Sequence, residues 1–273
     1  MNAPRSCSGW RSSCEDAGIK LSAVVSDLMG VSSRAMLQAL IDGQRDPQVL
    51  ADLAKRRMRS KIPELGQALT GRFREHHAFL TRLYLDQYDQ LSSAINQLTV
   101  RVEEAMAPFR PVLDLLDTIP GVNRAVAEVI VAETGGDMTR FASAKHLASW
   151  AGLCPGHHES AGKVRSTRVR PGNAHLKGAL GMAAFAASRT KDSYLQARYK
   201  RLTARRGPMK ALIAVEHSII TAIWHMLTDN LPNHELGGHY FTRRDPERAA
   251  RRAVTRLNEL GYRVTLDPLQ TAG

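Results

Sequence analysis

One short stretch, residues 157–173, carries the side chains best suited to chemistry on a phosphodiester. Ser160 offers a hydroxyl group, and Gly162 lets the backbone approach a ligand closely. Four cations follow within a few residues: Lys163, Arg165, Arg168 and Arg170. Such cations make charge-assisted hydrogen bonds to phosphate oxygens and can stabilise the charge of a phosphoryl transition state. The stretch is therefore expected to contact nucleic acid.

The nucleophile within this stretch is not fixed by residue types alone. A serine in a turn more commonly makes a hydrogen bond within that turn. Ser166 is a rival with equally basic neighbours, but no glycine lies within two residues of it as Gly162 does of Ser160, which favours Ser160. Cys154, His157 and His158 lack a distant fourth ligand, so no metal site is predicted.

Local patterns predict how this stretch is held. Val164 and Val169 favour a short β-ribbon, which Pro171-Gly172 ends. Asn173 is a good N-cap for a helix that begins at residue 174. A preceding helix over residues 141–152 ends on Gly152 and would anchor the base of the ribbon.

Charge favours a polyanionic partner for the whole chain. Its 273 residues include 38 Lys and Arg against 26 Asp and Glu, a formal net charge of +12. Aromatic residues make up only 5%, which argues against a base-stacking platform and favours contact with phosphates. Three scattered cysteines fit a reducing cytoplasm. No signal peptide or membrane span is evident, so a cytoplasmic protein without a membrane partner is predicted.

Two further segments are candidates for phosphate contact. Residues 119–124 (IPGVNR) predict a helix, a tight turn and a second helix, with Gly121 in the turn and Asn123 as cap before Arg124. This pattern resembles the helix-hairpin-helix motif, although an ordinary helical hairpin remains an alternative. A later helix carries four arginines, either a solvated face or a nucleic-acid contact: Arg198, Arg201, Arg205 and Arg206.

The predicted fold is mainly α-helical. Residues 1–14 are expected to be a disordered tail, 15–110 a helical and coiled-coil region, 111–230 a compact helical domain with the turn and the ribbon, and 231–273 a basic C-terminal appendage. Apolar or semi-apolar residues recur in steps of three, four or seven from 65 to 106, which predicts one helix of about 45 residues over 63–107. Its narrow stripe favours a coiled coil, either with a partner chain or with the preceding helices folded back. A homo-oligomer through this helix is predicted.

Several motifs in a fixed order resemble the IS110 family of insertion-sequence transposases. They are residues 116–122 (LDTIPGV), 148–156 (ASWAGLCPG), 159–163 (ESAGK) and 214–219 (AVEHSI), with 17–21 (AGIKL) and 43–47 (GQRDP) upstream. The resemblance covers nearly the whole chain from about Glu15 onward. It implies a mobile-element protein that binds DNA and acts in DNA transposition and recombination, with Ser160 as the nucleophilic serine.

The resemblance also implies a further domain and an RNA partner. Family members place an RNase H-like domain with four carboxylates ahead of the coiled coil, and that domain holds divalent metal. This chain is expected to lack the domain and to need no cofactor of its own. A structured, element-encoded guide RNA is an implied partner. A remnant that binds DNA or RNA and dimerises without catalysis is the alternative function.

Overall fold

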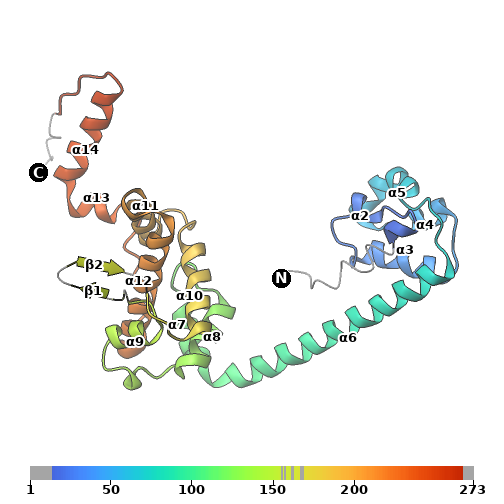
Figure 1. Cartoon of the computed structure of the whole chain (residues 1–273), viewed down its shortest axis with the longest axis horizontal. Coiled ribbons are helices and arrows are strands. Elements are labelled where there is room, and N and C mark those ends of the chain that lie inside the picture. Colours follow the sequence, from blue (N-terminus) through green and yellow to red (C-terminus); the bar gives the residue numbers. More distant parts are fainter. Residues whose placement is uncertain (1–13, 155, 157, 161–162, 167–168, 267–273) are drawn as a thin grey trace, which may run out of the picture. The chain divides into compact units, whose positions relative to one another are not determined.

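The computed structural model describes residues 14–154, 156, 158–160, 163–166 and 169–266. The predicted mainly α-helical class is confirmed (Figure 1). The chain divides into two compact units, Met1–Glu104 and Ala105–Gly273. Most of the predicted tail, residues 1–13, lies outside the described residues, but Cys14 is buried in the core of the first unit.

The first unit is built from short helices and one long one. They are α2 (Leu21–Val24), α3 (Val31–Ile41), α4 (Pro47–Asp52), the 3-10 helix η1 (Arg56–Lys61), α5 (Ile62–Ala68) and α6 (Glu75–Met106). Asp46 caps α4 by accepting a hydrogen bond from the backbone N–H of Gln48, with Pro47 at the first helical position. A buried cluster that includes Met36, Leu50 and Leu65 holds these helices together.

The predicted single helix over residues 63–107 is wrong, because the chain leaves the helical path between α5 and α6. The backbone N–H of Lys20 donates to the carbonyl of Ala68 at 2.8 Å, and that of Arg72 donates to Ala17 at 2.7 Å. Gly71 lies so close to this segment that a Cβ atom there would sit 2.5 Å from the Ala17 carbonyl oxygen. These two long-range bonds replace the helical hydrogen bond that the Arg72 N–H would donate to the Ala68 carbonyl.

The second unit contains the 3-10 helices η2 (Ala107–Phe109) and η3 (Met138–Arg140), a β-hairpin and eight α-helices within the described residues. The α-helices are α7 (Arg110–Asp117), α8 (Arg124–Thr134), α9 (Ala144–Trp150), α10 (Ala174–Ala187), α11 (Tyr194–Arg206), α12 (Pro208–Asp229), α13 (Tyr240–Arg244) and α14 (Pro246–Glu259). The strands β1 (His158–Ser160) and β2 (Lys163–Ser166) pair antiparallel.

Helix α12 is the central helix of this unit. It packs against α9, α10 and α11 and buries Val215, Ile219 and Ile223 in the main core. By length and composition alone α12 could cross a membrane, whereas the sequence predicted no membrane span. A helix in the core of a soluble protein can have the same length and apolar composition. In this structure the buried face of α12 is covered by its neighbours.

Segment 231–244, predicted as part of an appendage, is attached to the second unit. The backbone N–H of Gly238 donates to the carbonyl of Asp192 at 2.7 Å, and Glu235 accepts from the N–H of Tyr194 at 2.7 Å. Phe241 of α13 stacks on Tyr194 at the start of α11, with ring centroids 5.4 Å apart. These contacts fix α13 beside α11 and set where α14 begins.

Candidate nucleic-acid site

The hairpin that bears Ser160 projects from the second unit (Figure 1). Ser160 is the last residue of β1 and pairs with Lys163, the first residue of β2, while Arg165 lies further along β2. The structure gives the backbone path of both strands but not their side chains. Gly162 and Arg168 lie outside the described residues, and Arg170 is exposed.

Two glycines allow the chain segments at the base of this hairpin to lie in close contact. A Cβ atom on Gly172 would lie 2.3 Å from the backbone nitrogen of Gly152, so no larger residue fits between these two chain segments. The backbone N–H of Asn173 donates to the carbonyl of Trp150 at 3.1 Å, closing the loop. The two ends of the segment that contains Ser160 are therefore held together by direct backbone contact.

Asn173 also ties this base to the helical frame. Its Oδ1 accepts from the backbone N–H of Leu176 at 2.8 Å, which confirms the predicted cap of α10. Its Nδ2 donates to the carboxylate of Glu133 on α8 at 2.5 Å. One side chain thus fixes the start of α10 relative to α8 and positions the end of the hairpin.

The turn at residues 119–124 joins α7 to α8 as predicted, but the structure gives its residues local partners. Gly121 has φ +90° and packs on α10, where a Cβ atom would lie 2.3 Å from the carbonyl oxygen of Ala183. Asn123 caps α8 through the backbone N–H of Val126, and Arg124 pairs with Glu128 at 2.8 Å. Close packing on α10 is thus enough to explain why residue 121 is a glycine. Phosphate contact by this turn stays a prediction.

The four arginines of α11 do not share one surface. Arg198 is half-buried, and its Nε is buried without a hydrogen-bond partner among the described residues. Its charge also contributes to lowering the pKa of His217 on α12. Arg201, Arg205 and Arg206 are exposed. Arg201 and Arg205 line a cleft of about 850 Å³ between α11 and the helices α13 and α14.

Two titratable groups on α12 are perturbed by burial. Burial raises the pKa of the Glu216 carboxyl, and the charge of Lys177 on α10 opposes this shift. Burial also lowers the pKa of His217, and the charge of Arg198 adds to that effect. Both shifts favour the neutral forms of these side chains, which suits their position on a helix of the core.

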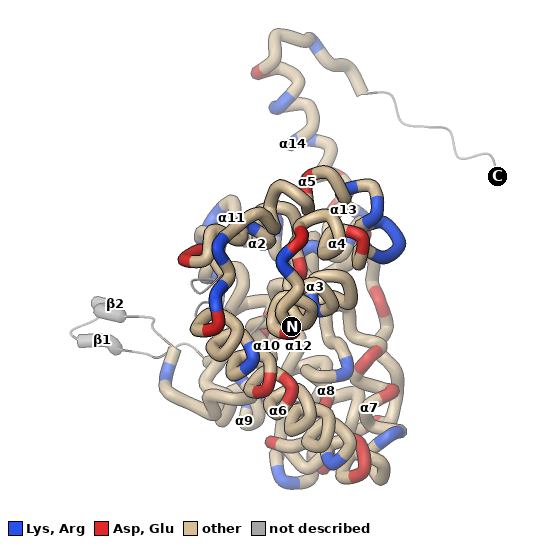
Figure 2. Tube along the Cα trace, turned by 90° about the vertical axis from the view of Figure 1, so that its right-hand side faces the viewer, with Lys and Arg blue, Asp and Glu red and all other residues tan. Residues whose placement is uncertain are grey.

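The last helix, α14, carries cations that were not among the predicted phosphate contacts. Arg248, Arg252 and Arg256 recur every four residues along α14 and line the same cleft as Lys200 and Arg201 of α11. Figure 2 shows basic segments recurring along α14. The four-residue spacing of these arginines places them on one face of a helix, so the sequence alone could have predicted a basic face here. The fold-back of α13, which brings this face to α11, has no comparable sequence signal.

A metal site was not expected in this chain. Among the residues that the structure describes, no three His, Cys, Asp or Glu side chains are grouped closely enough to hold a metal ion. His157, one of the residues considered for zinc, lies outside that part of the chain. Cys14 and Cys154 are free thiols, and burial raises the pKa of Cys14 to about 11.

Comparison with known proteins gives a consistent set of relatives. Residues 113–200, which include the hairpin and most of α11, match the family model described as the transposase IS116/IS110/IS902 family. The IS110 insertion-element 43.6 kDa protein of Streptomyces coelicolor is 34% identical over 127 residues, 46% of this chain and 31% of that protein. A pilin gene-inverting protein of Moraxella bovis is 33% identical over 121 residues, 43% of this chain and 37% of that protein.

A third relative is the IS900 insertion-element 42 kDa protein of Mycobacterium paratuberculosis, 28% identical over 146 residues, 53% of this chain and 36% of that protein. Residues 113–200 are therefore similar to the IS116/IS110/IS902 family of transposases, and the relatives include proteins of two insertion elements. The chain spans about a third of the length of the curated relatives it matches.

Proposed function

We propose that this chain is the part of an insertion-element transposase that binds DNA and exchanges strands, with Ser160 as its nucleophile. The observation that carries the proposal is the family match over residues 113–200, because that range contains the hairpin of Ser160. The gene-inverting protein of Moraxella bovis, which is similar over 43% of this chain, supports recombination as the reaction class. The bacterial cytoplasm is the proposed location.

The proposed chemistry is a transfer of a phosphoryl group between oxygens. The Oγ atom of Ser160 attacks a DNA phosphorus and loses its proton, while the bond from that phosphorus to a sugar oxygen breaks and the sugar oxygen takes up a proton. Lys163, Arg165, Arg168 and Arg170 lie within ten residues of Ser160 and supply positive charge for the phosphoryl oxygens. The resulting phosphoserine link preserves bond energy for strand exchange. The other proposed phosphate contacts are Gly121, Asn123 and Arg124.

Divalent metal belongs to the acidic domain that the family resemblance implies. The described residues of this chain contain no group of carboxylates suited to hold it, so no step is assigned to metal here. A structured guide RNA encoded by the element is a further proposed partner. The alternative function, a dimerising nucleic-acid-binding protein without catalysis, is favoured by the cations of α11 and α14, which need no acidic domain to bind phosphate.

A fusion protein tests the proposed function against this alternative. A family acidic domain is joined ahead of Glu15, and recombination between two plasmid-borne element ends is measured by amplification of the new junctions. We expect junctions from the fusion in the presence of Mg²⁺ and none from the unfused chain. A fusion that binds DNA but forms no junctions would favour the non-catalytic alternative.

Helix α6 is the proposed site of self-association. From Asp86 onward most of its side chains are exposed, including Leu91, Ile95, Leu98 and Val102. These four residues are spaced by four, three and four positions, which is the spacing of a coiled-coil seam. Leu98 is 65% exposed in the single chain. A second copy of the helix would bury this seam, so we propose a homo-oligomer formed through α6.

Replacing Ile95 and Leu98 with lysine should weaken self-association by roughly a hundredfold or more, because two charges would enter each side of the seam. Sedimentation velocity over a concentration series at micromolar protein measures the change. Asn96→Lys together with Gln97→Lys is the matched control, since these neighbours lie off the seam and add the same charge. Equal behaviour of the two double variants, or a monomeric unmodified chain at tens of micromolar, would contradict the proposal.

A further inference from the structure

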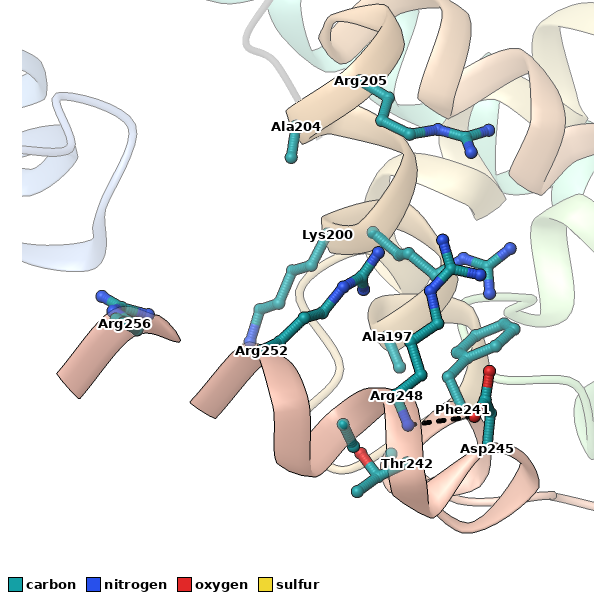
Figure 3. Close-up of a pocket in the computed structure, with 13 residues that line it drawn as sticks. Ala197, Lys200, Ala204, Arg205, Phe241, Thr242, Asp245, Arg248, Arg252 and Arg256 are labelled. Atoms are coloured by element: carbon teal, nitrogen blue, oxygen red, sulfur yellow. Dashed lines mark hydrogen bonds between the residues drawn. The ribbon is translucent and has the colours of Figure 1, made fainter. Parts of the chain in front are cut away.

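The cleft between α11 and α14 is walled by cations from both sides. Lys200 reaches into it from α11, and Arg248 and Arg252 reach into it from α14 (Figure 3). Six cations line it in all: Lys200, Arg201, Arg205, Arg248, Arg252 and Arg256. The lining also includes the small side chains Ala197, Ala204 and Ala249, which leave space between the walls.

The charge of this cleft is not neutralised within the described part of the chain. Asp245 is the only carboxylate among its lining residues, and its Oδ1 accepts the backbone N–H of Arg248 as the cap of α14. None of the six cations forms an ion pair with any described residue. Like charges held this close repel one another, and a polyanion in the cleft would relieve that repulsion.

The geometry of α14 suits a chain of phosphates. Arg248, Arg252 and Arg256 lie four residues apart and so rise along one face in steps of about 6 Å. Successive phosphates of an extended strand are separated by a similar distance. A line of cations on one wall and further cations on the other can therefore contact one backbone over several nucleotides.

The cleft is better suited to a single strand than to a duplex. A duplex carries two backbones around a wide stacked core, and proteins usually meet it by placing a helix in its major groove. Here two helices form opposing walls of a space of only about 850 Å³. A positively charged groove that follows one backbone is the usual arrangement for unpaired nucleic acid.

Base stacking is not part of this arrangement. Within the part of the chain that the structure describes, Phe241 is the only aromatic residue that lines the cleft. The guanidinium of Arg201 lies 4.5 Å from its ring centroid, and Tyr194 stacks on it at 5.4 Å. Because its ring is already engaged by these neighbours, contacts to phosphates rather than to bases would supply the affinity.

We propose that the cleft between α11 and α14 binds the phosphodiester backbone of one unpaired nucleic-acid strand without selecting its bases. This inference rests on the proposed function in taking nucleic acid as the polyanion, and it adds the site and the unpaired state of the strand. The long arginines form the walls, and the small residues between them leave room for the strand. Sequence specificity must then come from other parts of the protein or from a guide strand.

The test uses the full chain and fluorescein-labelled single strands of twelve nucleotides, one of DNA and one of RNA, with a blunt duplex of the same sequence as a competitor. Fluorescence anisotropy gives the affinity at several salt concentrations. Arg248→Ala with Arg252→Ala should weaken single-strand binding by roughly tenfold or more and reduce the slope of log affinity against log salt by about 1.4. Arg248→Lys with Arg252→Lys keeps the charge and should retain most of the affinity.

Arg251→Ala with Arg263→Ala is the matched control, because it removes two exposed cations nearby that do not line the cleft. Equal losses in the control and in the cleft variant would overturn the proposal, as would a duplex that competes as well as the single strand. Equal affinity for DNA and RNA is expected from backbone contact. If the fusion protein recombines DNA while the cleft variant keeps its single-strand affinity, the proposed function stands and this inference fails.

Discussion

Replacing Ser160 with alanine in the fusion protein should reduce recombination by about a thousandfold or more, because no other group is proposed to form the covalent link to DNA. The assay is the amplification of recombinant junctions described above. A denaturing gel would in addition reveal a covalent protein–DNA species in the unmodified fusion and not in the Ser160→Ala variant. Binding to DNA should change little, since the serine is one neutral side chain among many cations.

Ser166→Ala is the control for this prediction. Ser166 lies at the end of β2 in the same hairpin and has equally basic neighbours, so its loss perturbs the same local structure. The Ser166→Ala fusion should keep most of its recombination activity. If Ser160→Ala stays active, or if both variants fail equally, Ser160 is not the nucleophile and the hairpin serves only to bind nucleic acid.

Local signals predicted the ends of helices well. Asn123 and Asn173 each cap the helix that follows, as their side chains and neighbours indicated. A cap needs only a side-chain oxygen within three residues of a backbone N–H group, so the sequence contains all the information.

Features that depend on distant contacts could not be predicted in this way. The apolar stripe continues through residues 69–74, yet the helix breaks there because Gly71 and Arg72 contact the backbone of Ala17. The cleft depends on the contacts of α13 with α11, which turn α14 so that its arginines face Lys200. The family resemblance, by contrast, indicated Ser160 directly, whereas the residues alone favoured it over Ser166 only through the nearby Gly162 and not through charge.

A substitution at Gly121 tests what the turn between α7 and α8 does. Replacing Gly121 with alanine should destabilise the second unit by about 3 kcal/mol or more. The new Cβ atom would lie 2.3 Å from the carbonyl oxygen of Ala183 and 2.6 Å from the backbone nitrogen of Ala187. These are backbone atoms of α10, which cannot move without disturbing the packing of that helix. Chemical denaturation followed by circular dichroism measures the loss.

Gly135→Ala is the matched control, because Gly135 also has a positive φ, +75°, and ends the same helix that Gly121 precedes. Its Cβ atom would meet only the end of the Arg140 side chain at 3.8 Å, so the substitution adds backbone strain of about 1 kcal/mol without a collision. The difference between the two variants therefore measures the contact of the turn with α10. If Gly121→Ala is no less stable than Gly135→Ala but binds DNA more weakly, the close contact does not hold this turn, and the glycine instead serves a phosphate of the DNA.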